Sequence, residues 1–84
     1  SLDLALDAET AAIKGMKSPV AGDADCLVFP NLEASNVFYK CCSKFDKSEI
    51  GAMLMGAKVP CVLSSRGDTS KTKLYSIALA AMLA

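Results

Sequence analysis

The chain has 84 residues, of which 52% are hydrophobic, and its nine basic and nine acidic side chains give a formal net charge of zero. This length allows one domain at most, and the charge balance excludes a general nucleic-acid binder and a polybasic membrane-surface segment, which both need a basic stripe. The apolar runs are far shorter than a membrane span requires, and no basic residue opens the chain as in a signal peptide. We therefore expect a cytoplasmic protein with neither a nucleic-acid nor a membrane partner.

The hydrophobic fraction is high for so short a chain, because a small domain buries only about two-thirds of its unfolded surface and usually needs a metal or disulfide staple. The cysteines match no zinc-binding spacing, and the sequence has no histidine. We therefore expect no bound metal and four buried, reduced thiols, those of Cys26, Cys41, Cys42 and Cys61. The composition favours a piece of a larger protein whose apolar faces meet an absent partner.

The first half of the chain predicts two strands and two helices. Alternating leucines predict a strand over 2–6, followed by a short helix over 8–14 that Asp7 caps. A loop rich in turn-forming residues precedes an apolar run over 26–29, which is typical of a buried, parallel-type strand. From residue 32 to 42 the apolar residues recur at helical spacing.

The second half predicts two more strands and a final helix. Apolar runs over 50–55 and 59–63 predict strands, the second at an edge of the sheet because it contains a proline. A turn over 64–68 then leads to a last helix, which Asp68 or Ser70 is expected to cap. This helix is apolar on nearly every face, which is typical of a buried helix, and the methionines of these segments read as core filling.

Strands that alternate with helices predict a layered α/β/α fold, in which ligands bind beyond the carboxyl ends of the strands. Two predicted strand-to-helix corners, 29–36 and 62–70, are therefore candidate sites. In the second, Arg66 carries a planar charge suited to phosphate, and Ser64 and Ser65 can donate hydrogen bonds to a developing oxyanion. The alternative is a plain turn whose polar residues satisfy backbone groups.

Several ordered motifs resemble those of the phosphate acetyl/butyryltransferase family, and most closely its butyryl branch. Residues 29–36 resemble the family's Pro-Asp-Leu-Glu/Asn-Ala-Gly-Asn motif, and residues 56–66 resemble its Gly-Ala-Lys-x-Pro-Val-x-x-Thr/Ser-Ser-Arg segment. Residues 13–25 resemble the loop ahead of the family's buried strand, and residues 74–84 resemble its closing Ala-rich helix. The resemblance covers nearly the whole chain.

The resemblance implies that residues 1–84 are the C-terminal fragment of an enzyme with two α/β domains, related to the isocitrate/isopropylmalate dehydrogenase fold, whose partner domain is absent. It implies an acyltransferase that moves a butyryl or acetyl group between coenzyme A and inorganic phosphate by direct attack of the thiolate on an acyl phosphate. Coenzyme A is then a substrate, no cofactor is permanently bound, and the full-length protein forms a homo-oligomer. The fragment alone is expected to be inactive.

The resemblance also assigns roles to residues. Ser65 would hydrogen-bond the carbonyl oxygen and Arg66 would hold the phosphoryl group, so these are the predicted catalytic residues. The predicted substrate-binding residues are Ser64, Asn31, Glu33 and Asn36. In the first motif, Asn31 and Ser35 replace the family's usual Asp and Gly.

One departure concerns the base for the coenzyme A thiol. Thr72 stands near the position where the acetyl branch has an acidic residue proposed for this role, and Asp68 is the nearer acidic side chain. Either another group removes the thiol proton, or the chain belongs to the butyryl branch.

Two other classes of function compete with the enzyme fragment. One is a stand-alone oligomerisation or interaction module that keeps the fold without catalysis, and the apolar last helix favours self-association. The other is a dehydrogenase of the related fold, which is disfavoured because no Gly-x-Gly-x-x-Gly follows a predicted strand.

Overall fold

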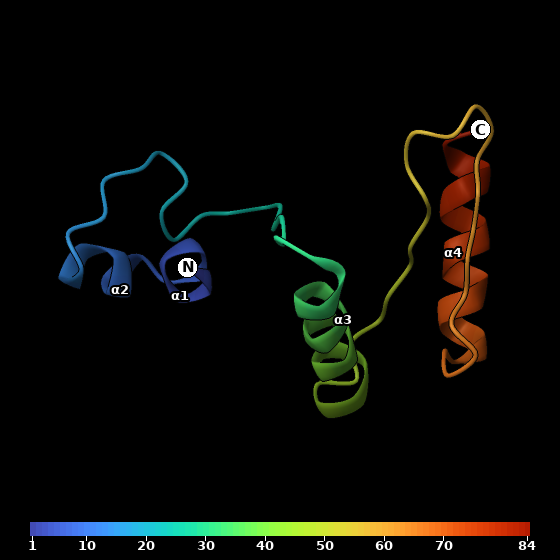
Figure 1. The fold of residues 1–84 in the computed structure, drawn as a ribbon, viewed down its shortest axis with the longest axis horizontal. Coiled ribbons are helices and arrows are strands. Elements are labelled where there is room, and N and C mark those ends of the chain that lie inside the picture. Colours follow the sequence, from blue (N-terminus) through green and yellow to red (C-terminus); the bar gives the residue numbers. More distant parts are fainter. The chain divides into compact units, whose positions relative to one another are not determined.

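The computed structural model describes all residues from Ser1 to Ala84 as short helices joined by turns and extended segments (Figure 1). The chain divides into two compact units, Ser1–Leu32 and Glu33–Ala84. No helix combines the length and the apolar character that crossing a bilayer demands.

The first unit begins with the helices α1 (Leu2–Leu6) and α2 (Ala8–Ile13), which pack against each other. The carboxylate of Asp7 caps α2 by accepting a hydrogen bond from the backbone N–H of Glu9 at 3.1 Å. Gly15 follows α2 with a φ of +68°, a conformation that glycine adopts without steric cost. The predicted helix and its cap are therefore confirmed.

The prediction of a strand over 2–6 is wrong. The backbone N–H of Ala5 donates to the carbonyl of Ser1 at 3.1 Å, and that of Asp7 donates to Asp3 at 3.0 Å, which is the i to i+4 pattern of an α-helix. Leucine and alanine favour helix, and no neighbouring strand is present to pair with this segment.

The loop after α2 folds back onto α1. The backbone N–H of Gly22 donates to the carbonyl of Leu4 at 2.8 Å. A Cβ atom at Gly22 would lie 2.5 Å from the Cα of Ala8, so only glycine fits this close approach. The expected loop is confirmed, but the expected buried strand over 26–29 is not, because no strand forms there and Val28 is 92% exposed.

The helix α3 (Leu32–Lys40) starts at the last residue of the first unit and continues into the π-helical turn η1 (Cys41–Phe45). After η1, Lys47 has a φ of +54° and is the one non-glycine residue in the left-handed region. The backbone N–H of Ser48 donates to the carbonyl of Cys42 at 2.9 Å across this bend. The predicted helix over 32–42 is confirmed, whereas the wider π turn at its end was not predicted.

The segments over 50–55 and 59–63 meet in one antiparallel bridge between Leu54 and Cys61, where the backbone N–H of Leu54 donates at 2.9 Å. No further ladder forms, so the chain contains helices where they are expected but not the sheet of the predicted α/β/α layering. Two short segments without additional paired strands are only marginally stable as a sheet in water.

The helix α4 (Ser70–Met82) closes the chain. Its cap is Thr69, whose hydroxyl oxygen accepts a hydrogen bond from the backbone N–H of Thr72 at 3.1 Å. The prediction that Asp68 or Ser70 caps this helix is therefore wrong, because the extended backbone at Thr69 places its hydroxyl within reach of the free N–H group.

One face of α4 packs on the extended segment over 50–55. The buried hydroxyl of Ser76 accepts from the backbone N–H of Ala52 at 3.0 Å and donates to the carbonyl of Thr72 at 2.8 Å. Residues 53–60 line a small pocket together with Leu83, the residue that follows α4, so this segment reaches the C-terminal end of the helix.

Most large apolar side chains are exposed, which corrects the expectations of a buried last helix, core methionines and buried thiols. Leu74 and Ile77 are 62% and 60% exposed, and Met82 is 82% exposed. Cys26 and Cys41 are exposed, and Cys42 and Cys61 are half-buried. A chain of this size can bury only a limited fraction of its surface, so many of these side chains stay exposed.

Candidate functional site

The Ser-Arg corner, residues 64–69, connects the second extended segment to α4. The backbone N–H of Ser65 donates to Oδ2 of Asp68 at 2.9 Å, and the backbone N–H of Asp68 donates to the carbonyl of Ser65 at 3.1 Å. This pair of bonds closes a tight turn, and Thr69 then caps the helix. The turn holds Ser65 and Arg66 at the N-terminal end of α4, where the helix dipole favours anions.

The last turn of α3 fixes this corner from the other side. The hydroxyl of Tyr39 donates to Oδ1 of Asp68 at 2.5 Å in a part-buried position. The next residue, Lys40, donates from Nζ to Oγ of Ser65 at 3.4 Å. Lys44, in η1, donates to the carbonyl of Gly67 at 3.4 Å. Three successive contacts therefore connect the α3–η1 segment to the Ser-Arg corner.

The hydroxyl of Ser65 is arranged as a hydrogen-bond donor. Its Oγ accepts from Nζ of Lys40 and from the backbone N–H of Gly67, each at 3.4 Å. A hydroxyl has two acceptor lone pairs and one proton, so these two contacts leave its proton for another group. This arrangement suits stabilisation of a developing oxyanion.

The guanidinium of Arg66 stands uncompensated. Arg66 is exposed, as are Ser64 and Ser65, and the ion pairs of the chain, Lys14–Asp3 and Lys71–Glu49, do not involve it. A permanent positive charge beside a donor hydroxyl at a helix N-terminus suits a phosphoryl or carboxylate group.

The carboxylate of Asp68 is fully engaged in this structure. The hydrogen bond from Tyr39, followed by the Ser65 N–H and the charges of Lys40 and Lys73, lowers the pKa of Asp68. The same hydrogen bond raises the pKa of Tyr39 to about 12. Because both carboxylate oxygens accept hydrogen bonds and the pKa is lowered, Asp68 is poorly suited to take a proton from a thiol.

The other predicted binding residues lie at different distances from the corner. Asn36 precedes Lys40 by one turn on the same face of α3, whereas Glu33 lies in the first turn, about 10 Å along the axis at 1.5 Å per residue. Both side chains are exposed. Asn31 belongs to the first compact unit, whereas the corner belongs to the second.

Tyr39 and Lys40 were missed from the sequence. The available signal was their helical spacing from Asn36, which places them three and four residues further along α3. The contacts of Tyr39 and Lys40 depend on which loop of the folded chain reaches the end of α3. The helical spacing of these residues does not show which loop that is.

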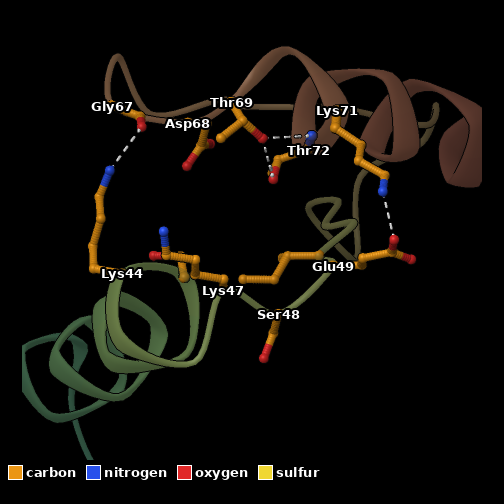
Figure 2. A pocket seen from close by; sticks show the side chains of 11 residues that line it. Lys44, Lys47, Ser48, Glu49, Gly67, Asp68, Thr69, Lys71 and Thr72 are labelled. Carbon is orange, nitrogen blue, oxygen red and sulfur yellow. Dashed lines mark hydrogen bonds and ion pairs between the residues drawn. The ribbon is translucent and has the colours of Figure 1, made fainter.

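A pocket of about 480 Å³ lies beside the corner, between residues 43–50 and residues 67–72. Figure 2 shows Lys44 and Lys47 on one wall and the segment from Gly67 to Thr72 on the other. Lys71 pairs with Glu49 at 2.5 Å, which raises the pKa of Lys71. No group of three or more His, Cys, Asp or Glu side chains is arranged to hold a metal ion.

Comparison with known proteins relates the chain to one family of transferases. Residues 1–81 match the family described as phosphate acetyl/butaryl transferase. A phosphate acetyltransferase of Thermotoga maritima is 46% identical over 100% of this chain and 29% of its own length. A phosphate butyryltransferase of Clostridium beijerinckii is 49% identical over 100% of this chain and 28% of its own length. The chain thus spans less than a third of these relatives, which carry both acetyl and butyryl names.

A solved structure gives the same relationship. The crystal structure of a branched-chain phosphotransacylase from Enterococcus faecalis superposes with a TM-score of 0.82 and 41% identity, over 96% of this chain and 29% of that protein. The path of this chain therefore follows that of one segment of a larger phosphotransacylase. With the match to the family over residues 1–81, the conclusion is that this chain belongs to the phosphate acetyl/butaryl transferase family.

Proposed function

We propose that this chain is the C-terminal part of an enzyme that moves a short-chain acyl group between coenzyme A and inorganic phosphate. The observation that carries the proposal is the Ser-Arg corner, where a donor hydroxyl and an uncompensated guanidinium meet at the N-terminus of α4. The names of the relatives support the same reaction.

In the proposed reaction, the sulfur of the coenzyme A thiolate attacks the carbonyl carbon of an acyl phosphate. A C–S bond forms, the C–O bond to phosphate breaks, and its electron pair leaves with inorganic phosphate. Ser65 donates a hydrogen bond to the carbonyl oxygen as negative charge develops there. Arg66 binds the phosphoryl oxygens with its planar fork.

Neither Asp68 nor Thr72 is suited to take the proton of the coenzyme A thiol. Asp68 is engaged by Tyr39 and Ser65, and its lowered pKa disfavours proton uptake. Thr72 carries only a hydroxyl, which accepts from the hydroxyl of the capping Thr69 at 3.1 Å. We therefore assign the base to the remaining part of the enzyme.

The proposal extends to the other predicted binding residues and to the architecture. Ser64 belongs to the Ser-Arg corner, and Asn36 lies on α3 one turn before Lys40. In the proposal, both offer hydrogen bonds to the acyl phosphate or to coenzyme A amides. Asn31 and Glu33 keep the substrate-binding role that the family motif implies for them. In the full-length protein, we propose that the extended segments join the sheet of an α/β/α domain of isocitrate/isopropylmalate dehydrogenase type, that a second domain completes the cleft, and that coenzyme A enters as a substrate.

Steady-state kinetics of the full-length enzyme with Arg66→Gln test this assignment. A charge-assisted contact is worth about 1.5–3 kcal/mol, so kcat/KM should fall roughly tenfold to a hundredfold. Arg66→Lys should restore only part of the loss, because a point charge lacks the bidentate fork. Wild-type kinetics for Arg66→Gln, with unchanged circular dichroism, would mean that the corner is only a turn.

The exposed apolar face of α4 favours a second candidate function, an oligomerisation or interaction module without catalysis. Leu74, Ile77 and Met82 are all more than half exposed, and such a cluster is typical of a surface that another chain covers. One observation distinguishes the two candidate functions. If the chain is an interaction module, the full-length protein should self-associate but should not catalyse acyl transfer.

A further inference from the structure

We propose that Lys40 is a further substrate-binding residue, which supplies the second positive charge of a phosphoryl site shared with Arg66. This inference rests on the acyl-transfer function proposed above. Lys40 ends α3, is half-buried, and donates from Nζ to Oγ of Ser65 at 3.4 Å. An ammonium group has three donors, so two remain for phosphoryl oxygens next to the Ser65 hydroxyl.

The charge balance of the corner supports this role. Neither Lys40 nor Arg66 takes part in an ion pair of the chain. The nearby carboxylate of Asp68 already accepts from the Tyr39 hydroxyl and the Ser65 N–H. Both donors are neutral, so Asp68 keeps its negative charge, which lies near Lys40. With Arg66 added, the corner remains net positive beside one donor hydroxyl, and a phosphoryl group carries roughly −1.5 to −2 charges near pH 7.

The position of Lys40 is set by its neighbours on both sides. Tyr39 clamps the corner to α3 through Asp68, and Lys44 contacts the carbonyl of Gly67. Nζ of Lys40 also lies 5.1 Å above the ring centre of Tyr39, within the range of a cation–π contact. The ammonium is therefore held at the corner rather than left on a free surface side chain.

The role of the second cation follows from the direction of the reaction. Negative charge moves onto the phosphate as the C–O bond breaks, so a fixed positive charge beside it stabilises bound inorganic phosphate more than bound acyl phosphate. Its loss should therefore appear as weaker binding of inorganic phosphate. Arg66 lies in the turn before α4 and Lys40 ends α3. Together they can hold the phosphate while Ser65 contacts the carbonyl oxygen.

The test uses the full-length enzyme with Lys40→Met, Lys40→Arg and the control Lys73→Met. Lys73 lies on α4 and also acts on the charge of Asp68, but no contact connects it with Ser65. In the phosphate-consuming direction, Lys40→Met should raise the KM for inorganic phosphate roughly tenfold to a hundredfold. The KM for acyl-CoA should stay within about twofold, Lys40→Arg should recover much of the loss, and Lys73→Met should behave as wild type.

Calorimetric titration with inorganic phosphate alone gives a second readout, in which Lys40→Met should weaken binding by the same factor. A wild-type enzyme without acyl transfer would overturn the proposed function itself. An active wild type whose Lys40→Met variant matches Lys73→Met in both assays would overturn the role of Lys40 alone. Equal losses for phosphate and acyl-CoA that Lys40→Arg does not recover would also overturn it, because they indicate a structural role.

Discussion

The hydroxyl of Tyr39 is the group whose removal most directly tests the connection between α3 and the Ser-Arg corner. It donates to Oδ1 of Asp68 at 2.5 Å, and Oδ2 of the same carboxylate holds the Ser65 N–H at 2.9 Å. Tyr39→Phe keeps the ring and its packing and removes only this donor. We therefore expect a less ordered corner in an otherwise folded protein.

The size of the effect follows from the kind of bond that is lost. A hydrogen bond to a charged group contributes about 1.5–3 kcal/mol, and the lower end applies because Asp68 is only half-buried and water can replace the phenol. About 1.5 kcal/mol corresponds to roughly a tenfold fall in kcat. The KM values should change less, because Ser65 acts mainly in the transition state.

The pH dependence gives a readout that a change in packing alone would not produce. Asp68 has a lowered pKa in the folded protein, so its charged form stabilises the corner at neutral pH and this contribution is lost as the pH falls through that folded-state pKa. Tyr39→Phe removes the largest cause of the lowering. The acid limb of the kcat profile should therefore move to higher pH.

The raised pKa of Tyr39 allows the Tyr39–Asp68 hydrogen bond to be followed by titration at high pH. The phenol remains a donor until the pH approaches about 12, so the clamp persists above the pKa of an ordinary tyrosine and is lost as the pH rises through the folded-state value. Spectrophotometric titration of tyrosine absorbance should show one late-ionising phenol that disappears in Tyr39→Phe.

Tyr75→Phe is the matched control for this experiment. Tyr75 lies on α4 with Nζ of Lys71 5.7 Å above its ring centre, and no contact connects it with Ser65 or Asp68. It should therefore retain wild-type kcat and pH dependence. If Tyr39→Phe is as active as Tyr75→Phe and has the same acid limb, the clamp does not position the corner and the reasoning is refuted.

Three further predictions concern the chain itself. The purified 84-residue chain should form no acyl phosphate from acyl-CoA and phosphate, and clear turnover would contradict its assignment as part of a larger site. Its exposed α4 face should drive self-association, which Leu74→Ser with Ile77→Ser should weaken; sedimentation showing only monomer for the unmodified chain at high concentration would count against this. Thr69→Ala removes the cap of α4 and should cost about 1 kcal/mol of unfolding free energy, measured by urea denaturation of the full-length protein, whereas Ser70→Ala should have a smaller effect.

Local order could be predicted from the sequence because its physical causes lie within a few residues. The helix over 32–40 follows from apolar spacing, and the helices over 8–13 and 70–82 follow from the polar residues that precede them as possible caps. Asp7 was identified as a cap because its acceptor reaches an N–H two residues later. At α4, the same argument placed the helix correctly but chose a neighbour of Thr69, because adjacent polar residues compete for the cap and the backbone angles decide between them.

The strand predictions failed because strand formation depends on residues far away in the sequence. Apolar runs such as 26–29 have the composition of buried strands, but a strand exists only where another strand pairs with it. In this chain one bridge, between Leu54 and Cys61, is all that forms. The segment over 2–6, without a partner, satisfies its backbone groups as a helix.

In the candidate site too, the local sequence predicts some residues and only the tertiary structure reveals others. The sequence alone predicts Ser65 and Arg66 as site residues, because a serine and an arginine between a predicted strand and a helix N-terminus suit phosphate chemistry, and because the motif resembles that of a known family. Tyr39 meets Asp68 across 29 residues, and Lys40 meets Ser65 across 25. Only the tertiary structure decided these contacts, because they depend on where the backbone between the two segments leads, and no local pattern of side chains determines that path.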